Sequence, residues 1–143
     1  MSPTAETLLL SLPGTPDAPA RARAALAHLE SFVSDAVQSD LRLLVTELVS
    51  NSVRHAGLGP SDRLTVEAAV RPGRIRVEVS DPGPGFEVAP GPPPDAPRHI
   101  DDMRAGGFGL ELIARMADSW GVRQSPTTRV WFELCDADSV DPL

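Results

Sequence analysis

The fold is organised around the stretch Thr46-Glu47-Leu48-Val49-Ser50-Asn51-Ser52-Val53-Arg54-His55. It lies in a run over 41–56 without glycine or proline, and one stripe of this run repeats at helical spacing through Leu41, Leu44, Val45, Leu48 and Ser52. Glu47, Asn51 and Arg54 fall on a different face, which puts a carboxylate and a carboxamide one helical turn apart. Such a face is either solvated surface or part of a binding site, and later stretches bear on that choice.

Composition narrows the possible functions. The 143 residues predict a single domain over 1–143, and 41% hydrophobic content is enough for a core. The net charge of −7 argues against nucleic acid and anionic membrane as partners. No apolar run approaches the roughly 20 residues that span a bilayer, and no secretory signal is visible. With Cys135 as its single cysteine, the chain is expected in the cytoplasm.

The basic residues exclude several enzyme classes. All 13 are arginine, so a Walker A loop, Schiff-base chemistry and the lysine-dependent protein-kinase signature are ruled out. A single cysteine and the scattered His28, His55 and His99 give no metal-ligand spacing. His55 is better explained as a packing or capping residue near a helix end than as a catalytic one.

Local patterns predict the other elements. Thr7–Leu12 is typical of a first strand, 19–33 of a first helix, and 34–40 of a short break with Ser39 or Asp40 as N-cap of the central helix. Arg63–Arg71 and Arg74–Ser80 alternate around Pro72-Gly73, which predicts an antiparallel hairpin. Further segments read as a helix starting near Leu110, a strand over Ser119–Arg123 and a last strand over Arg129–Leu134. The expected fold is an α+β two-layer sandwich, a mixed and mostly antiparallel sheet with helices on one face.

Two glycine-rich segments follow the hairpin. Asp81-Pro82-Gly83-Pro84-Gly85 comes directly after the second strand, and Gly106-Gly107-Phe108-Gly109-Leu110 opens a helix. Taken alone, the first is often only a turn and the second only a hinge between loop and helix. Between them, 87–105 is proline-rich and without periodicity. So long a structureless loop in a compact domain is usually functional or disordered.

In this order and spacing the motifs resemble those of the GHKL (Bergerat-fold) ATPases, and most closely the small anti-sigma-factor serine kinases of bacterial partner-switching systems. Glu47-x-x-x-Asn51 looks like the N box, Asp81-x-Gly83-x-Gly85 like the G1 box and Gly107-x-Gly109-Leu110 like the G2 box. Each motif alone is weak, but the ordered set is fairly specific. The resemblance extends over the whole chain and implies a histidine kinase-like ATP-binding fold.

The resemblance implies a role for each box. Asn51 would be a ligand of Mg²⁺ and contact the nucleotide, and Glu47 would orient or deprotonate the attacking hydroxyl near the γ-phosphate of ATP. Asp81 would accept a hydrogen bond from the adenine amino group. Glycines allow close backbone approach to the base or phosphates, and a helix start binds phosphate without lysine. The nucleotide-binding set completed in this way also includes Gly83, Gly85, Gly107, Phe108, Gly109 and Leu110.

The segment over 87–105 corresponds to the family's mobile lid over ATP. It contains Arg98 and Arg104, and either one reaches the γ-phosphate or is simply a solvated charge; Arg104 is included in the predicted nucleotide site. Two departures from the family pattern stand out. Phe108 occupies a position where small or basic residues are common, and Thr127-Thr128-Arg129 replaces a Gly-Gly-Lys-Thr motif that supports the nucleotide, so Thr128 inherits that role.

The implied function is an ATP- and Mg²⁺-dependent serine/threonine protein kinase. It would phosphorylate an anti-anti-sigma protein with a STAS domain and sequester a sigma factor, with homodimerisation as a further family expectation. The alternative is a docking module that regulates its partner without phosphorylating it, whether or not it binds nucleotide. A sensor-kinase fragment acting on histidine is disfavoured because 143 residues leave no room for a phospho-accepting helical hairpin. Trp120 and Trp131 are expected in the core or an interface.

Overall fold

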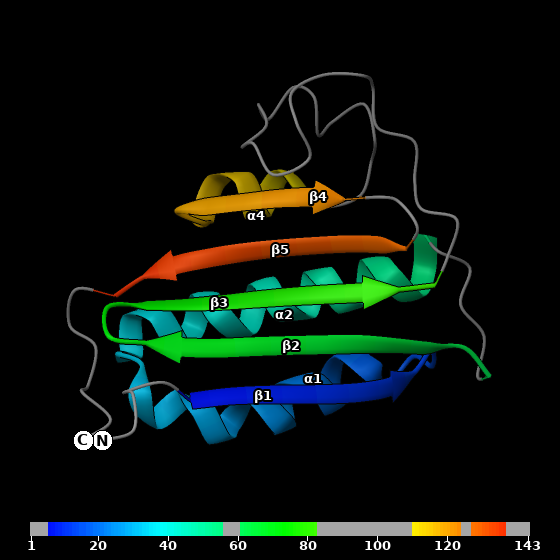
Figure 1. Ribbon diagram of the computed structural model, residues 1–143, viewed down its shortest axis with the longest axis horizontal. Coiled ribbons are helices and arrows are strands. Elements are labelled where there is room, and N and C mark those ends of the chain that lie inside the picture. The colour runs from blue at the N-terminus through cyan, green and yellow to red at the C-terminus, as the bar shows by residue number, and fades with distance from the viewer. Residues whose placement is uncertain (1–5, 56–60, 83–109, 124–126, 137–143) are drawn as a thin grey trace.

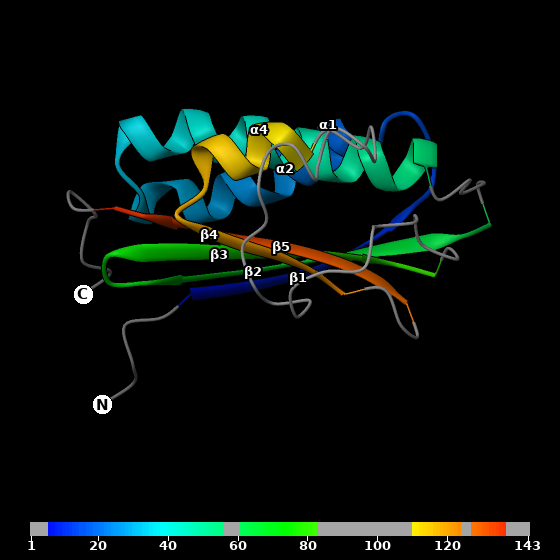
Figure 2. The same cartoon turned by 90° about the horizontal axis from the view of Figure 1, so that it is seen from above.

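The computed structural model describes residues 6–55, 61–82, 110–123 and 127–136. They form two layers, a five-stranded sheet and a layer of helices on one of its faces (Figures 1 and 2). The elements follow in the order β1 (Glu6–Pro13), α1 (Ala18–Leu26), η1 (Ala27–Phe32), α2 (Asp35–His55), β2 (Arg63–Arg71), β3 (Arg74–Asp81), α4 (Leu110–Met116), β4 (Ser119–Arg123) and β5 (Thr128–Cys135). This is the α+β architecture of the Bergerat fold, as the sequence predicted.

The sheet has the order β1-β2-β3-β5-β4, and each pairing between the described strands is antiparallel. The predicted hairpin is confirmed, since Arg71 pairs with Arg74 around a tight turn. Gly73 in this turn has a φ of 81°, a value that L side chains rarely adopt. The strand over 119–123 lies at one edge of the sheet and β1 at the other.

Alternation along the strands assigns their side chains to two faces. The inner face packs against the helices and contributes most of the core, with Phe132 fully buried near its centre. The other strand residues with less than 2% exposure on this face are Leu12, Leu64, Val66, Ile75, Val77 and Val79. The outer face carries the intervening residues, among them Leu9, Arg76 and Trp131. Each strand therefore has a core side and an outer side, as period-two alternation predicts.

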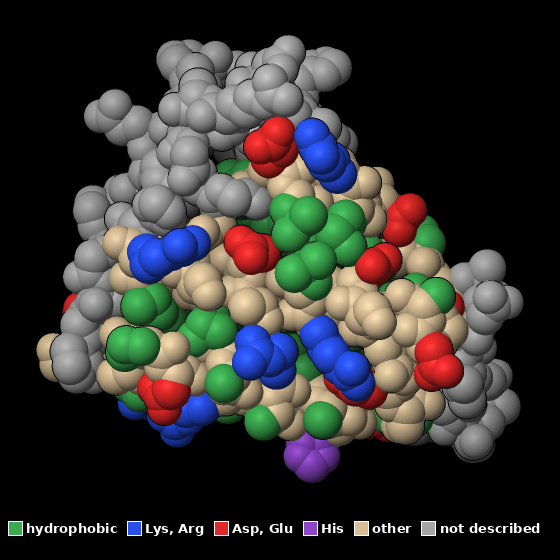
Figure 3. Space-filling model, turned by 180° about the vertical axis from the view of Figure 1, so that it is seen from behind, with side chains coloured by type: hydrophobic (Ala, Val, Ile, Leu, Met, Phe, Trp, Pro, Cys, Tyr) green, Lys and Arg blue, Asp and Glu red, His purple; other side chains and the backbone are tan. Residues whose placement is uncertain are grey.

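The helix layer consists of α1, η1, α2 and α4. The predicted first helix is present, but its second half tightens into the 3₁₀ segment η1. Arg42 of α2 forms a two-pronged ion pair with Glu30 of η1, with Nε donating to Oε2 at 2.8 Å. The outward surface of this layer mixes basic, acidic and apolar side chains (Figure 3). No helix within the described ranges is long and apolar enough to cross a membrane.

Helix α2 begins at Asp35, so the predicted break over 34–40 is wrong, and Ser34 precedes the helix in place of the predicted N-caps, Ser39 or Asp40. The carbonyl of Ser34 accepts the backbone N–H of Gln38 at 2.9 Å. The backbone N–H of Ser34 is in turn bound by Asp136 Oδ2 at 2.8 Å, from the end of β5. Ser34 followed by Asp35 is itself a local start signal, and the Asp136 contact, from 102 positions away, adds a long-range partner for the Ser34 N–H.

Candidate functional site

Helix α2 presents the predicted carboxylate and carboxamide. Asn51 is only 7% exposed, so the simple interpretation of this face as solvated surface fails at that residue. Its Oδ1 accepts a hydrogen bond from Arg54 Nη2 at 3.1 Å. Glu47, one turn earlier, is half-buried. A partly exposed carboxylate beside a buried amide is an arrangement suited to a ligand that enters from the surface.

The second part of the site lies where β3 ends and β5 begins. Asp81 is the last residue of β3 and pairs directly with Thr128, the first residue of β5. Both are buried, at 4% and 3% exposure, and alternation places them on the inner face with Val79 and Val130. The Thr128 hydroxyl oxygen is buried without a hydrogen-bond partner in the structure. A buried hydroxyl without a partner costs roughly 1–3 kcal/mol, so its place beside Asp81 needs an explanation.

Packing brings these two parts together. Helix α2 contacts both β3 and β5, and its carboxyl end lies at the same end of the sheet as the end of β3 and the start of β5 (Figure 1). Helix α4 also packs against α2 and begins at Leu110, which is 3% exposed. The structure thus places Asn51, Asp81 and Thr128 in one region. Helix α4 borders this region because it packs against α2.

Several predicted residues lie outside the described residues. They are Gly83, Gly85, Arg98, Arg104, Gly107, Phe108 and Gly109, together with the rest of the predicted lid over 87–105. Their predicted roles therefore stay predictions. What the structure describes is the floor of the candidate site on α2, β3 and β5.

The described side chains offer a polar ligand both hydrogen-bond donors and acceptors. Asp81 offers carboxylate oxygens that accept from an amino group, and the Thr128 hydroxyl can both donate and accept. A ligand with neighbouring donor and acceptor atoms, such as adenine, would satisfy that hydroxyl. The Asn51 carbonyl oxygen is a hard ligand suited to Mg²⁺, which usually keeps several waters and bridges phosphates, and so needs few protein ligands. The described residues hold no group of three or more His, Cys, Asp or Glu side chains placed to bind a metal ion.

Sequence reasoning missed two features, one in the site and one on the opposite face of the sheet. One is the Arg54–Asn51 hydrogen bond, although the i to i+3 spacing brings such side chains together on a helix. The other is a set of two cavities, of about 510 and 400 Å³, on the outer face of the sheet. The strand alternation predicts an outer face, but it does not predict its hollows.

Comparison with known proteins gives the class. A family model described as the histidine kinase-like ATPase domain matches residues 12–134, and the chain belongs to this family. Among its relatives, the serine-protein kinase RsbW of Listeria monocytogenes serovar 1/2a is 33% identical over 121 residues, covering 79% of this chain and 76% of the relative. RsbW of Oceanobacillus iheyensis is 26% identical over 116 residues, covering 76% and 73%. RsbW of Bacillus licheniformis is 33% identical over 87 residues, covering 55% and 53%.

These matches confirm the resemblance drawn from the three boxes. The matched region begins in β1 and ends in β5, so it includes Glu47, Asn51, Asp81 and Thr128. Use of ATP follows from the family. The similarity to RsbW places the chain with the serine-protein kinases of that family.

Proposed function

We propose that this protein is an ATP-dependent serine/threonine kinase that phosphorylates a STAS-domain anti-anti-sigma protein and sequesters a sigma factor. The observation that carries the proposal is the buried pair of Asp81 and Thr128, set beside the helix that bears Glu47 and Asn51. The similarity to the RsbW serine-protein kinases supports it.

Each described side chain has a role in this proposal. Asp81 accepts a hydrogen bond from the adenine amino group, and the Thr128 hydroxyl forms a hydrogen bond with the same base. Asn51 Oδ1 would hold Mg²⁺, which when bound would neutralise charge on the phosphates. Glu47 accepts the proton of the substrate hydroxyl while the hydroxyl oxygen attacks the γ-phosphorus of ATP. The bond between the γ-phosphorus and the β–γ bridging oxygen then breaks, and ADP is released. The hydrogen bond from Arg54 orients the Asn51 oxygen, and because an amide oxygen has two lone pairs it leaves one of them for the metal.

Calorimetry of ATP and ADP binding, with and without Mg²⁺, tests the nucleotide site. We expect Asp81→Asn to weaken binding roughly 10- to 150-fold, the value of a hydrogen bond to a charged group. Asp35→Asn is the matched control, since it makes the same chemical change at an exposed position in the first turn of α2. If neither ATP nor ADP binds at practical concentrations, the boxes are scaffold and the nucleotide proposal fails.

Phosphotransfer needs its own test. Radiolabelled ATP and the candidate STAS proteins of the host are incubated with the wild-type protein, and label on a serine or threonine is expected. No transfer to any of them would favour the second candidate, a regulatory docking module without kinase activity. Phe108 and the Thr127-Thr128-Arg129 stretch motivate this candidate. Under it, Glu47→Ala leaves partner regulation in cells unchanged, whereas the kinase proposal expects that regulation to be lost.

The proposal includes homodimerisation as a family expectation. Sedimentation equilibrium over a range of protein concentrations measures it directly. A surface formed by the first helix and first strand is one possible interface, and Arg21 and Arg23 lie on this helix. Arg23 donates to the Thr46 hydroxyl at 2.8 Å, so its side chain is tied to α2.

A further inference from the structure

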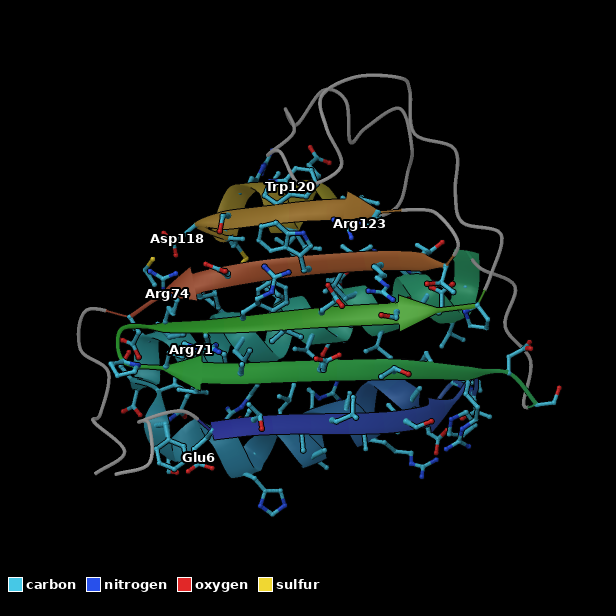
Figure 4. The ribbon with its side chains drawn as sticks, viewed as in Figure 1. Glu6, Arg71, Arg74, Asp118, Trp120 and Arg123 are labelled. Atoms are coloured by element: carbon cyan, nitrogen blue, oxygen red, sulfur yellow. The ribbon has the colours of Figure 1, made fainter. Side chains whose placement is uncertain are left out.

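The outer face of the sheet has no helix packed on it within the described residues, since all the described helices lie on the opposite side (Figure 2). Its side chains change in character from one edge to the other. Leu9 on β1 is 70% exposed at one side. Arg123 on β4 and Arg129 on β5 lie at the other, with Arg123 at the carboxyl end of β4 in Figure 4. One face thus carries an exposed leucine, opposite Glu67 in the register, at one end and two arginines at the other, and we call these the apolar end and the cationic end.

The cationic end contains an unfavourable pairing. Arg123 and Arg129 are direct partners in the antiparallel register of β4 and β5, and both are exposed. Like charges directly opposite each other destabilise a sheet. A cavity of about 400 Å³ lies beside them, lined by these two arginines together with Arg76, Glu78 and Trp131. Both guanidinium groups line this cavity from neighbouring strands, so its charge favours an anion.

Trp131 supplies a second and independent sign of a ligand. It lies on the outer face yet is only 9% exposed, and its indole Nε1 is buried without a hydrogen-bond partner in the structure. The ring is held by Arg76, whose guanidinium carbon lies 4.1 Å from its centroid. Arg76 is itself balanced by Glu78 at 3.6 Å and Glu133 at 3.5 Å. The N–H donor is therefore the group in this cluster that lacks a partner, and an acidic oxygen is the natural acceptor.

The cavity continues toward the apolar end. A second cavity, of about 510 Å³, also has Arg76 and Glu78 in its lining and extends over β2 and β1 to Leu9 and Ala69. The two cavities are neighbours that share Arg76 and Glu78 in their linings, and we call the pair the outer groove. From β1 to β4 it crosses four strand spacings, roughly 19 Å, which is the length of about 13 helical residues.

We propose that the outer groove binds an acidic amphipathic helix of a partner protein. Two of its carboxylates would pair with Arg123, Arg129 and the Trp131 N–H, and an apolar side chain at its other end would cover Leu9. Both ends of the groove argue for this occupant. An apolar end gives a nucleic acid or polyphosphate nothing to bind, and Glu67 and Glu78 on the same face repel a polyanion. Guanidinium groups pair bidentately with carboxylates.

This site is separate from the nucleotide site. Arg129 follows Thr128 directly on β5, so the two side chains point to opposite faces of the sheet. The inference does not rest on the proposed kinase activity, and it is tested without nucleotide. Loss of ATP binding and loss of groove binding are therefore separate results.

The experiment uses the full chain and a fluorescent helical peptide of about 14 residues, with two glutamates one turn apart at one end and leucines at the other. Anisotropy measures its dissociation constant. Trp120→Phe leaves Trp131 as the single tryptophan, so its emission reports contact at the groove directly. We expect saturable binding with a shift in Trp131 emission, and weaker binding at higher salt.

Variants locate the binding. Arg129→Glu should weaken it roughly tenfold or more. Trp131→Phe, which keeps the ring but removes the N–H donor, should weaken it about fivefold. Leu9→Ser tests the apolar end at an exposed position where folding is not at risk, and should weaken it several-fold. Arg115→Glu on α4 is the matched control and should have no effect, because α4 packs on the opposite face. Circular dichroism verifies that each variant folds.

Three results would overturn the proposal. One is no binding of the peptide, or equal binding of a peptide in which lysines replace the glutamates. Another is binding that Arg115→Glu weakens and Arg129→Glu does not, which would place it on the helix layer. The third is a stable wild-type dimer that Arg129→Glu converts to monomer, which would make a second copy of this chain the occupant.

Discussion

The two faces of β5 are built from alternate residues of one strand and have opposite tasks. Thr128, Val130 and Phe132 point toward the helices, whereas Arg129 and Trp131 point away from them. The inner residues form core and the floor of the candidate nucleotide site. The outer ones line the groove on the other side. Because successive side chains alternate, a single strand can serve two surfaces only a sheet's thickness apart.

Each face also holds one buried polar group without a partner. Within the described residues, the Thr128 hydroxyl and the Trp131 indole N–H are the side-chain atoms of this kind. Such groups cost roughly 1–3 kcal/mol each, so a fold keeps them where a ligand compensates. The inner group lies beside Asp81, a carboxylate, and the outer one beside two arginines. The ligand of the inner face is therefore expected to offer a hydrogen-bond donor, and the ligand of the outer face is expected to be an anion.

The largest effect is expected on the inner side, in catalysis. Glu47→Gln removes the proposed general base and should slow the proposed phosphotransfer to a partner serine or threonine roughly 10²–10⁴-fold. ADP affinity should stay close to wild type, because the proposed adenine contacts are on β3 and β5. Single-turnover labelling measures the rate and calorimetry the affinity. An unchanged transfer rate would remove Glu47 from the catalytic role and leave nucleotide binding in place.

The next largest effect is a difference in stability between a substitution on the inner face of the sheet and one on the outer face. Phe132→Ala leaves a cavity in the core and should lower the free energy of unfolding by about 3–5 kcal/mol. Leu9→Ala, a large-to-small change on the outer face, should stay within about 0.5 kcal/mol, because Leu9 is 70% exposed. Urea denaturation compares them. A loss at Leu9 as large as that at Phe132 would mean that the outer face is covered in solution.

The Thr128 hydroxyl, which has no hydrogen-bond partner in the structure, gives opposite predictions for stability and for nucleotide affinity. Thr128→Val removes it at nearly constant volume, so the nucleotide-free protein should be as stable as wild type or up to about 1 kcal/mol more stable. ATP and ADP affinity should fall about fivefold, because the hydroxyl no longer meets the base. Thermal unfolding without ADP measures the change in stability, and thermal unfolding with ADP measures the change in affinity. Thr65→Val on the half-buried outer side of β2 is the control; equal effects from both variants would contradict the role of Thr128.

The smallest effect concerns the helix layer alone. The hydrogen bond from Arg42, together with its charge, lowers the pKa of the Glu30 carboxyl below its ordinary value of 4.5. A carboxyl whose pKa is lowered by folding adds stability above its unfolded pKa and loses it as the pH falls through the folded value. Glu30→Gln should therefore lower the melting temperature by ~2 °C near neutral pH. The difference should vanish well below pH 4.5, and a constant difference would exclude the ion pair as its cause.

Much of the fold follows from local patterns. Period-two runs located the hairpin and the last strand, and Pro72-Gly73 located the turn of the hairpin, because these signals act over a few residues. The predicted start of α2 was wrong because Ser34, Ser39 and Asp40 are all suitable N-cap residues, and local chemistry does not choose between them; the structure starts the helix after Ser34, whose N–H is bound by Asp136. The candidate site was predicted as motif residues, and the structure brought Asn51, Asp81 and Thr128 together.

The sequence by itself determined the order of elements, the inner and outer side of each strand and the three boxes that mark the family, since periodicity, turn chemistry and motif spacing are properties of short stretches. Only the tertiary structure decided that Asp81 pairs with Thr128 and that Arg123 opposes Arg129. It also decided that the Trp131 N–H lacks a partner. Strand register sets these neighbours, and register depends on how β3, β4 and β5 meet after long connections, where local spacing carries no information.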